Sequence, residues 1–208
     1  MIIQWCVKGM SLPDDAAASA IIDERGGLVS NWWRDAGLIS PAGRRARLTP
    51  RNVDMHVNHF TMIDPTTQRP FNETTPFISL SAGTVERDAV ARTNYVRSAR
   101  QTALRFGTEF GLRRYAYLFT CWVILGPRQA VEIEGVAEEV RDLNTYRRYS
   151  AFQTEGEVLA KVIVPDNHIE KCERWELDPS GTRFQRAWMQ RNPRFTPPEV
   201  LINVRRLI

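Results

Sequence analysis

The stretch of sequence that decides the fold spans residues 153–165 and reads Gln153-Thr154-Glu155-Gly156-Glu157-Val158-Leu159-Ala160-Lys161-Val162-Ile163-Val164-Pro165. From Glu157 to Val164 the residues are mostly apolar and β-branched, which is typical of a buried strand, and Pro165 ends it. Side chains in a strand alternate between two faces, so Gln153, Glu155 and Glu157 share a face if the extended backbone begins at residue 153. We therefore expect two carboxylates at the mouth of a buried strand.

Two carboxylates on one surface have a structural and a chemical interpretation. In the structural interpretation, Glu155 and Glu157 form an exposed acidic strand edge, and the local pattern alone favours this interpretation. In the chemical interpretation, the two like charges raise the pKa of one carboxyl group, which provides a base and a charge stabiliser in one cleft. The strand that follows Glu157 should be buried and not peripheral, so an exposed acidic edge explains the pair less well, and this favours the chemical interpretation.

Outward from this strand the pattern predicts an α+β protein with helices mainly in the N-terminal half, forming a single domain over residues 1–208. Stretches with the composition of strands lie at residues 2–8, 77–81, 115–125, 131–133, 169–177 and 200–207, and residues 53–63 alternate like a strand with an exposed end. Helical patterns cover residues 16–22, 28–39 and 85–106, and residues 44–51 form a predicted basic loop.

Composition limits the partners. The net charge is +4, and only Lys8, Lys161 and Lys171 are lysines, so arginine supplies nearly all the positive charge. Arginine binds phosphate bidentately, which is compatible with a phosphate-rich partner. A genome that favours arginine codons is the alternative explanation of the arginine content.

The three cysteines are too few and too far apart in sequence to indicate a disulfide framework or a metal site. No apolar run approaches the roughly 20 residues of a membrane helix, and no signal-peptide pattern precedes the first strand, so we expect a cytoplasmic protein or an effector translocated without a classical signal peptide.

Three separate motifs resemble those of one enzyme family. Glu155-Gly156-Glu157-Val158-Leu159 is similar to the Glu-x-Glu-Val-Leu motif of mono-ADP-ribosyltransferases of the arginine, serine and glutamate class. Phe77-Ile78-Ser79-Leu80-Ser81 resembles their Ser-Thr-Ser strand, with Leu80 in the middle position, on the opposite face of the strand from the serines. Where that family has an arginine at the end of its first strand, this chain has Lys8, followed by Gly9.

The resemblance implies a split β-sandwich of two small antiparallel sheets with NAD, used as a substrate, in the cleft and no metal. It implies that Glu157 is the catalytic carboxylate, that Ser79 orients it, and that Glu155 takes the proton from the acceptor. Residues expected to bind NAD are Lys8, Gly9, Phe77, Ser81 and His59, with His56 as a further candidate. Residues expected to bind the acceptor come from the aromatic and basic stretch upstream of the glutamates: Tyr146, Arg148, Tyr149, Phe152 and Gln153.

The function implied is transfer of ADP-ribose from NAD to a macromolecule, either a protein side chain such as arginine or a base of RNA or DNA, which aromatic and basic residues are suited to stack. Two alternatives stay open: a non-catalytic relative that binds a nucleotide or a partner, and an NAD glycohydrolase. The resemblance also implies a bacterial toxin or effector, with an antitoxin or immunity protein as a further expected partner.

Overall fold

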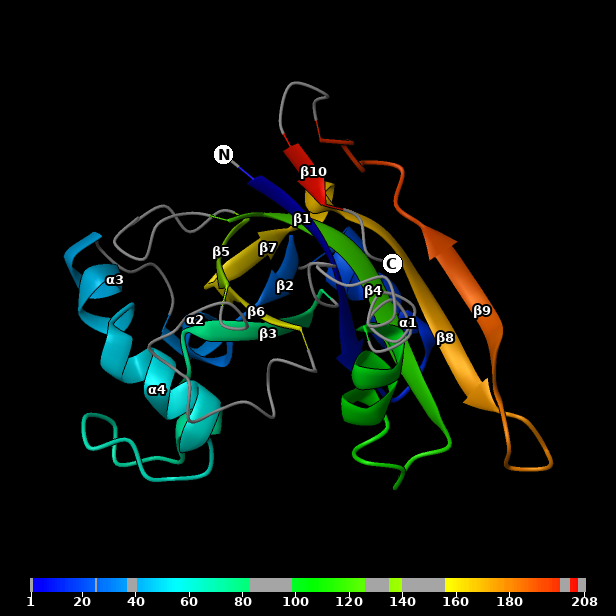
Figure 1. The fold of residues 1–208 in the computed structure, drawn as a ribbon, viewed down its shortest axis with the longest axis horizontal. Helices are drawn as coiled ribbons and strands as arrows, with labels where there is room; N and C mark the ends of the chain where they lie inside the picture. The colour runs from blue at the N-terminus through cyan, green and yellow to red at the C-terminus, as the bar shows by residue number, and fades with distance from the viewer. Residues whose placement is uncertain are drawn as a thin grey trace, which may run out of the picture.

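The computed structural model describes residues 2–24, 26–36, 41–82, 99–125, 135–139, 156–198 and 203–205 (Figure 1). Most of the strands form one eight-stranded sheet in the order β10-β1-β3-β6-β5-β4-β8-β9. Their bounds are β1 (Ile2–Met10), β3 (Phe77–Ser81), β4 (Tyr115–Leu125), β5 (Val136–Glu139), β6 (Glu157–Lys161), β8 (Ile169–Leu177), β9 (Phe184–Arg191) and β10 (Asn203–Arg205). A second sheet pairs β2 (Gly27–Val29) with β7 (Ile163–Pro165).

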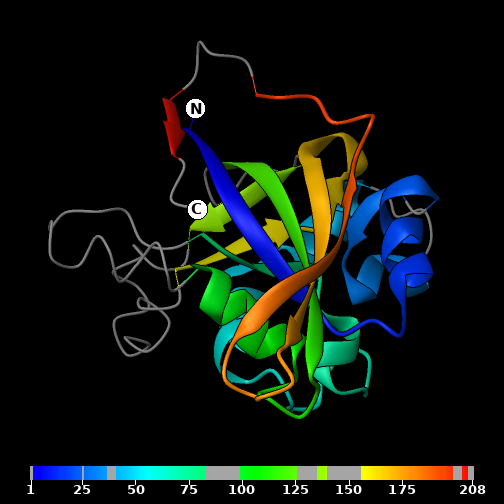
Figure 2. The ribbon, with the colours of Figure 1, turned by 90° about the vertical axis from the view of Figure 1, so that its right-hand side faces the viewer.

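The large sheet closes on itself, because β1 also pairs with β4 along its whole length, from Ile2↔Leu125 to Met10↔Tyr117. Figure 2 shows β1 crossing in front of β4. The ring β1-β3-β6-β5-β4 is held weakly at one point, since β1 and β3 share the single registered pair Val7↔Ser81. Ser81 is the last residue of β3, so among the described residues β1 and β3 pair only at this end of β3 and are not paired toward Phe77.

The α+β class and the N-terminal concentration of helices are confirmed, but the prediction of two antiparallel sheets is wrong in one respect. The sheet is mixed, because β10 runs parallel to β1 and β5 runs parallel to β4. The remaining pairings of the large sheet among the described residues are antiparallel.

The helices of the N-terminal half are α1 (Asp15–Asp23), α2 (Asn31–Ala36), α3 (Pro41–Arg47), α4 (Pro50–Asn58) and α5 (Phe71–Thr74), and residues 99–107 are also helical. At the start of α4 the Thr49 side chain accepts a hydrogen bond from the Asn52 N–H, and Pro50 occupies the first turn. Both features are strong helix-start signals. The buried residues of α4 are Val53, His56 and Val57, which have the spacing of one helix face.

Two sequence predictions are corrected by these helices. The predicted strand over residues 53–63 is instead the body of α4 and the loop after it, because the cap at Thr49 and the helical spacing outweigh a short alternation. The predicted basic loop over residues 44–51 is instead the second half of α3, a short turn and the start of α4.

Several strand predictions agree closely with the structure. The strands at 77–81, 115–125 and 169–177 have the predicted bounds, and β1 extends two residues past the prediction. The strand predicted from residue 157 to residue 164 divides into β6 and β7 at Val162, whose φ is 61°. Residues 131–133, and residues 85–98 of the predicted long helix, lie outside the described residues.

The core lies on both faces of β1 and β4. One face contributes Cys6 to the largest cluster, which also contains Ile21 and Ile22 of α1 and residues from β2 to β8. On the other face Val7 packs with Ala103 and Leu104 of the helical segment 99–107. All three cysteines are buried, and none of them forms a disulfide. None of the helices within the described ranges is long and apolar enough to cross a membrane.

Candidate active site

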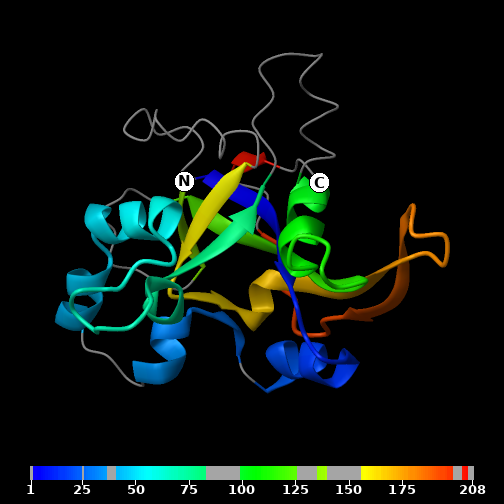
Figure 3. The same cartoon turned by 90° about the horizontal axis from the view of Figure 1, so that it is seen from below.

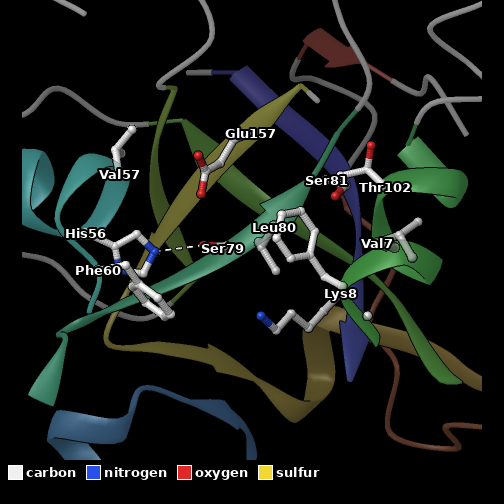
Figure 4. Close-up of a pocket in the computed structure, with 13 residues that line it drawn as sticks. Val7, Lys8, His56, Val57, Phe60, Ser79, Leu80, Ser81, Thr102 and Glu157 are labelled. Carbon is white, nitrogen blue, oxygen red and sulfur yellow. Dashed lines mark hydrogen bonds between the residues drawn. The ribbon is translucent and has the colours of Figure 1, made fainter. Parts of the chain in front are cut away.

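A cavity opens beside β1 and β3. Figure 3 shows α4 and the helical residues 99–107 on either side of β3 and β6, and residues of both helical segments line the cavity. Its lining comes from five segments that are distant in sequence. These are β1, α4 together with Phe60 just after it, β3, the helical segment 99–107 and the first residue of β6. Figure 4 shows that Lys8, His56, Ser79 and Glu157, the polar side chains discussed below, lie around this one space.

Strand pairing places the serines beside the glutamate. In the antiparallel pair of β3 and β6, Ser81 lies directly opposite Glu157 and Ser79 lies opposite Leu159. Directly opposed residues of an antiparallel pair project to the same face, so Ser79, Ser81 and Glu157 share the face that lines the cavity. Ile78 and Leu80 contribute to the main core cluster instead, although Leu80 also reaches the edge of the cavity.

Glu157 is the first residue of β6, and its partly buried carboxylate points into the cavity (Figure 4). The residue before it, Gly156, has a φ of 60°, so the extended backbone begins at Glu157 and does not continue through Gly156. Strand alternation therefore does not relate Glu155 to Glu157. Glu155 and the predicted acceptor-binding residues Tyr146, Arg148, Tyr149, Phe152 and Gln153 lie outside the described residues.

Lys8 brings an amine to the same cavity from β1. Burial lowers the pKa of the Lys8 ammonium, whereas the nearby Glu157 carboxylate acts in the opposite direction and favours the charged form. An amine in this position gains from a second anion, because that anion would compensate for the solvation lost on burial. The cavity therefore suits a ligand that carries a phosphate group near Lys8.

His56 is a cavity residue that sequence reasoning ranked below His59. The residue is 6% exposed. Its Nε2 lies 2.7 Å from Ser79 Oγ, and its Nδ1 lies 2.6 Å from Thr75 Oγ1. Burial, with the Lys8 charge as a smaller cause, lowers the pKa of His56 to about 3, so the imidazole is neutral at physiological pH. The structure places His59 at an exposed position 3.9 Å from the Asp54 carboxylate, outside the residues that line the cavity.

The remaining predicted NAD-binding residues have different places. Gly9 lines the cavity and allows close packing, because a Cβ on it would lie 1.7 Å from the Ala103 carbonyl oxygen. Phe77 is buried behind the cavity in a cluster with Val53 and Val57, and its ring meets the His56 ring edge to face. It supports His56 and is not part of the lining.

Two aromatic residues at the cavity were not found from sequence. Phe60, just after α4, is 43% exposed, and Phe106 in the helical segment 99–107 is 45% exposed; both line the cavity. Exposed aromatic rings at a cavity provide stacking surfaces for planar groups. In the described part of the chain no group of three or more His, Cys, Asp or Glu side chains is arranged to hold a metal ion.

No protein-family model matches the sequence, and no curated protein matches it either. Solved structures do match. EcPltA superposes with a TM-score of 0.53 at 11% identity, over 97% of this chain and 91% of its own. Two heat-labile enterotoxin variants, one of them described as from E. coli, have TM-scores of 0.46 at 15% and 17% identity, over 97% and 96% of this chain and 82% of theirs. The chain thus shares the fold of EcPltA, matched over 97% of its length at low sequence identity.

Proposed function

We propose that this protein is an NAD-dependent mono-ADP-ribosyltransferase that acts as a toxin or effector. The observation that carries the proposal is the single cavity in which Glu157 faces Ser81 across a strand pair, beside Lys8 and a His56–Ser79 hydrogen bond. A carboxylate, a cation and a supported hydroxyl are what a dinucleotide with a cleavable ribose bond requires. The fold shared with EcPltA supports the same assignment.

In the proposed reaction the bond between nicotinamide and the ribose carbon breaks, and its electron pair leaves with neutral nicotinamide. The ribose then carries positive charge, which the Glu157 carboxylate stabilises while accepting a hydrogen bond from a ribose hydroxyl. The acceptor attacks the same carbon and loses one proton, so the products are nicotinamide, the ADP-ribosylated acceptor and a proton. Glu155 is the proposed base for that proton.

Other side chains of the cavity are proposed to bind and orient the substrates. Lys8 would hold a phosphate oxygen as a point charge, without the bidentate geometry of arginine. The neutral His56 ring is hydrogen-bonded to Ser79 and fixes its hydroxyl on the cavity side. Phe60 and Phe106 offer ring faces or edges to the nicotinamide or to the acceptor.

The acceptor is proposed to be a macromolecule, either a protein side chain such as arginine or a base of RNA or DNA. The stretch that contains Tyr146, Arg148, Tyr149, Phe152 and Gln153 is the proposed contact with it. An antitoxin or immunity protein that neutralises the activity is a further proposed partner. The aromatic and arginine-rich composition of this stretch supports a flat or anionic partner surface.

The test is transfer of label from NAD, radiolabelled in its adenylate part, to macromolecules of a bacterial lysate. We expect the wild-type protein to label them and Glu157→Gln to reduce labelling by at least about a thousandfold, because loss of the main stabilising charge removes several kcal/mol. Glu109→Gln is the matched control, since Glu109 is an exposed glutamate paired with Arg113 on the surface. Equal labelling by the wild type and Glu157→Gln would overturn the assignment.

The same experiment identifies the acceptor and separates the alternatives. Label that resists nuclease and disappears with protease indicates a protein acceptor, and the opposite result indicates a nucleic acid. Free ADP-ribose without any labelled macromolecule would indicate an NAD glycohydrolase. Binding of NAD in calorimetry without release of nicotinamide would indicate a non-catalytic relative.

A further inference from the structure

Thr75 lies behind His56, two residues before the start of β3, and is 3% exposed. Its hydroxyl oxygen accepts a hydrogen bond from the Phe77 N–H at 3.2 Å and lies 2.6 Å from Nδ1 of His56. On the other side of the ring, Nε2 of His56 lies 2.7 Å from Ser79 Oγ. Thr75, His56 and Ser79 therefore form a continuous chain of hydrogen bonds from the protein interior to the cavity.

The direction of the hydrogen bonds in this chain depends on the tautomer of His56. If Nδ1 carries the hydrogen, the ring donates to Thr75, and the hydrogen of the buried Thr75 hydroxyl needs another acceptor. The hydrogen bonds of Thr75 in the structure provide no such acceptor among the described residues. A buried hydroxyl hydrogen without an acceptor is unfavourable, because folding removes it from water without replacement.

If Nε2 carries the hydrogen instead, the two buried members of the chain, Thr75 and His56, have all their groups satisfied. Thr75 accepts from the Phe77 N–H and donates to Nδ1, while Nε2–H donates to Ser79 Oγ. Ser79 then receives a hydrogen bond and keeps its own hydrogen. That hydrogen is free to turn toward the cavity, where the Glu157 carboxylate projects (Figure 4).

We propose that Thr75 is a positioning residue that holds His56 in the Nε2–H tautomer and thereby reserves the hydroxyl hydrogen of Ser79 for the carboxylate or substrate in the cavity. The expected effect of Thr75 on catalysis rests on the proposed function. Its effect on the His56 tautomer does not. With the opposite tautomer, Ser79 would donate its hydrogen to His56, and the cavity would lose a hydrogen-bond donor next to Glu157.

The structural part is tested on the wild-type protein, without any variant. Nitrogen-15 chemical shifts of the two ring nitrogens of His56, measured near neutral pH, distinguish a protonated from an unprotonated nitrogen. We expect the pattern of a hydrogen on Nε2 and none on Nδ1. A hydrogen on Nδ1 would overturn the proposal whether or not the protein is an enzyme.

The catalytic part compares Thr75→Val, which has the same shape but no hydroxyl, with Thr75→Ser, which retains it. We expect Thr75→Val to lower kcat for nicotinamide release about tenfold while KM for NAD changes by less than about twofold, since the group acts through Ser79 and not on bound NAD. Thr75→Ser should recover most of the lost kcat. The histidine spectrum of Thr75→Val should show both tautomers.

Thr74→Val is the matched control, because Thr74 is equally buried at 4% exposure but directs its hydroxyl to Asp64, away from the cavity. We expect its kcat to equal that of the wild type. Equal kcat in Thr75→Val and the wild type would refute the positioning role. A wild-type protein that releases no nicotinamide would instead refute the proposed function, and the tautomer measurement would still decide the role of Thr75.

Discussion

Acid should destabilise this protein through His56, and the size of the effect follows from its burial. Its pKa is about 3 in the folded protein, against an ordinary value of 6.5, so the unfolded chain binds a proton at a pH where the folded protein does not. Stability from this group is fully present above pH 6.5 and is lost as the pH falls toward 3. Between about pH 6 and about pH 4.5 the loss amounts to about 2 kcal/mol, because each pH unit contributes about 1.4 kcal/mol.

His168 contributes in the same direction and must be separated from His56. It is 8% exposed, stacks on Trp122, and has a pKa that burial lowers to about 4. The wild type should therefore lose about 4 kcal/mol over this pH interval from the two histidines together. His56→Gln should lose only about 2 kcal/mol, which is the share of His168.

Urea unfolding at the two pH values, followed by circular dichroism, measures the free energy of unfolding directly. The comparison uses the pH dependence of each protein, so a constant loss of stability in His56→Gln does not affect it. His168→Gln serves as the parallel variant and should show a similar reduction. The same pH dependence in His56→Gln and the wild type would show that His56 is not a buried neutral imidazole, and the reasoning on the His56–Ser79 bond would be refuted with it.

Two further predictions concern other charged groups. Lys8→Met should raise KM for NAD about tenfold to a hundredfold, because the phosphate loses a charge-assisted hydrogen bond, and an unchanged KM in steady-state assays would exclude Lys8 as a phosphate ligand. Arg47→Met should lower the free energy of unfolding by about 3–5 kcal/mol, because the Asp64 carboxylate, 2.8 Å from Arg47 Nη1 and 2% exposed, would be left buried without its partner. A loss below about 1 kcal/mol in urea unfolding would contradict that account.

The sequence was informative where side-chain pattern and burial coincide. Residues 115–125 form an almost entirely apolar run rich in aromatic and β-branched residues, and residues 77–81 combine three apolar residues with two serines before turn residues; both compositions favour a strand. Their alternation also predicts that Ser79 and Ser81 share a face, which the pairing with β6 shows. By contrast β9 is an exposed edge strand of mixed polar and aromatic residues, so no apolar pattern marked it.

The secondary structure around His56 and His59 was mispredicted for a different reason. Residues 53–59 place His56 and His59 among apolar residues at a spacing that fits a short strand as well as a helix. The Thr49-Pro50 helix start resolves this ambiguity and puts His56 on the buried face, with His59 at the exposed end. The contacts of His56 with Thr75 and Ser79 depend on tertiary packing, which local periodicity does not contain.

Release of nicotinamide from NAD by the purified protein tests the central claim most directly. The wild type should release nicotinamide, faster when a lysate supplies acceptors, and Glu157→Gln should release it at least about a thousandfold more slowly. Circular dichroism should show that Glu157→Gln folds like the wild type, since the Glu157 side chain projects into the cavity. Undiminished release by a folded Glu157→Gln variant would contradict the claim that this carboxylate acts on NAD.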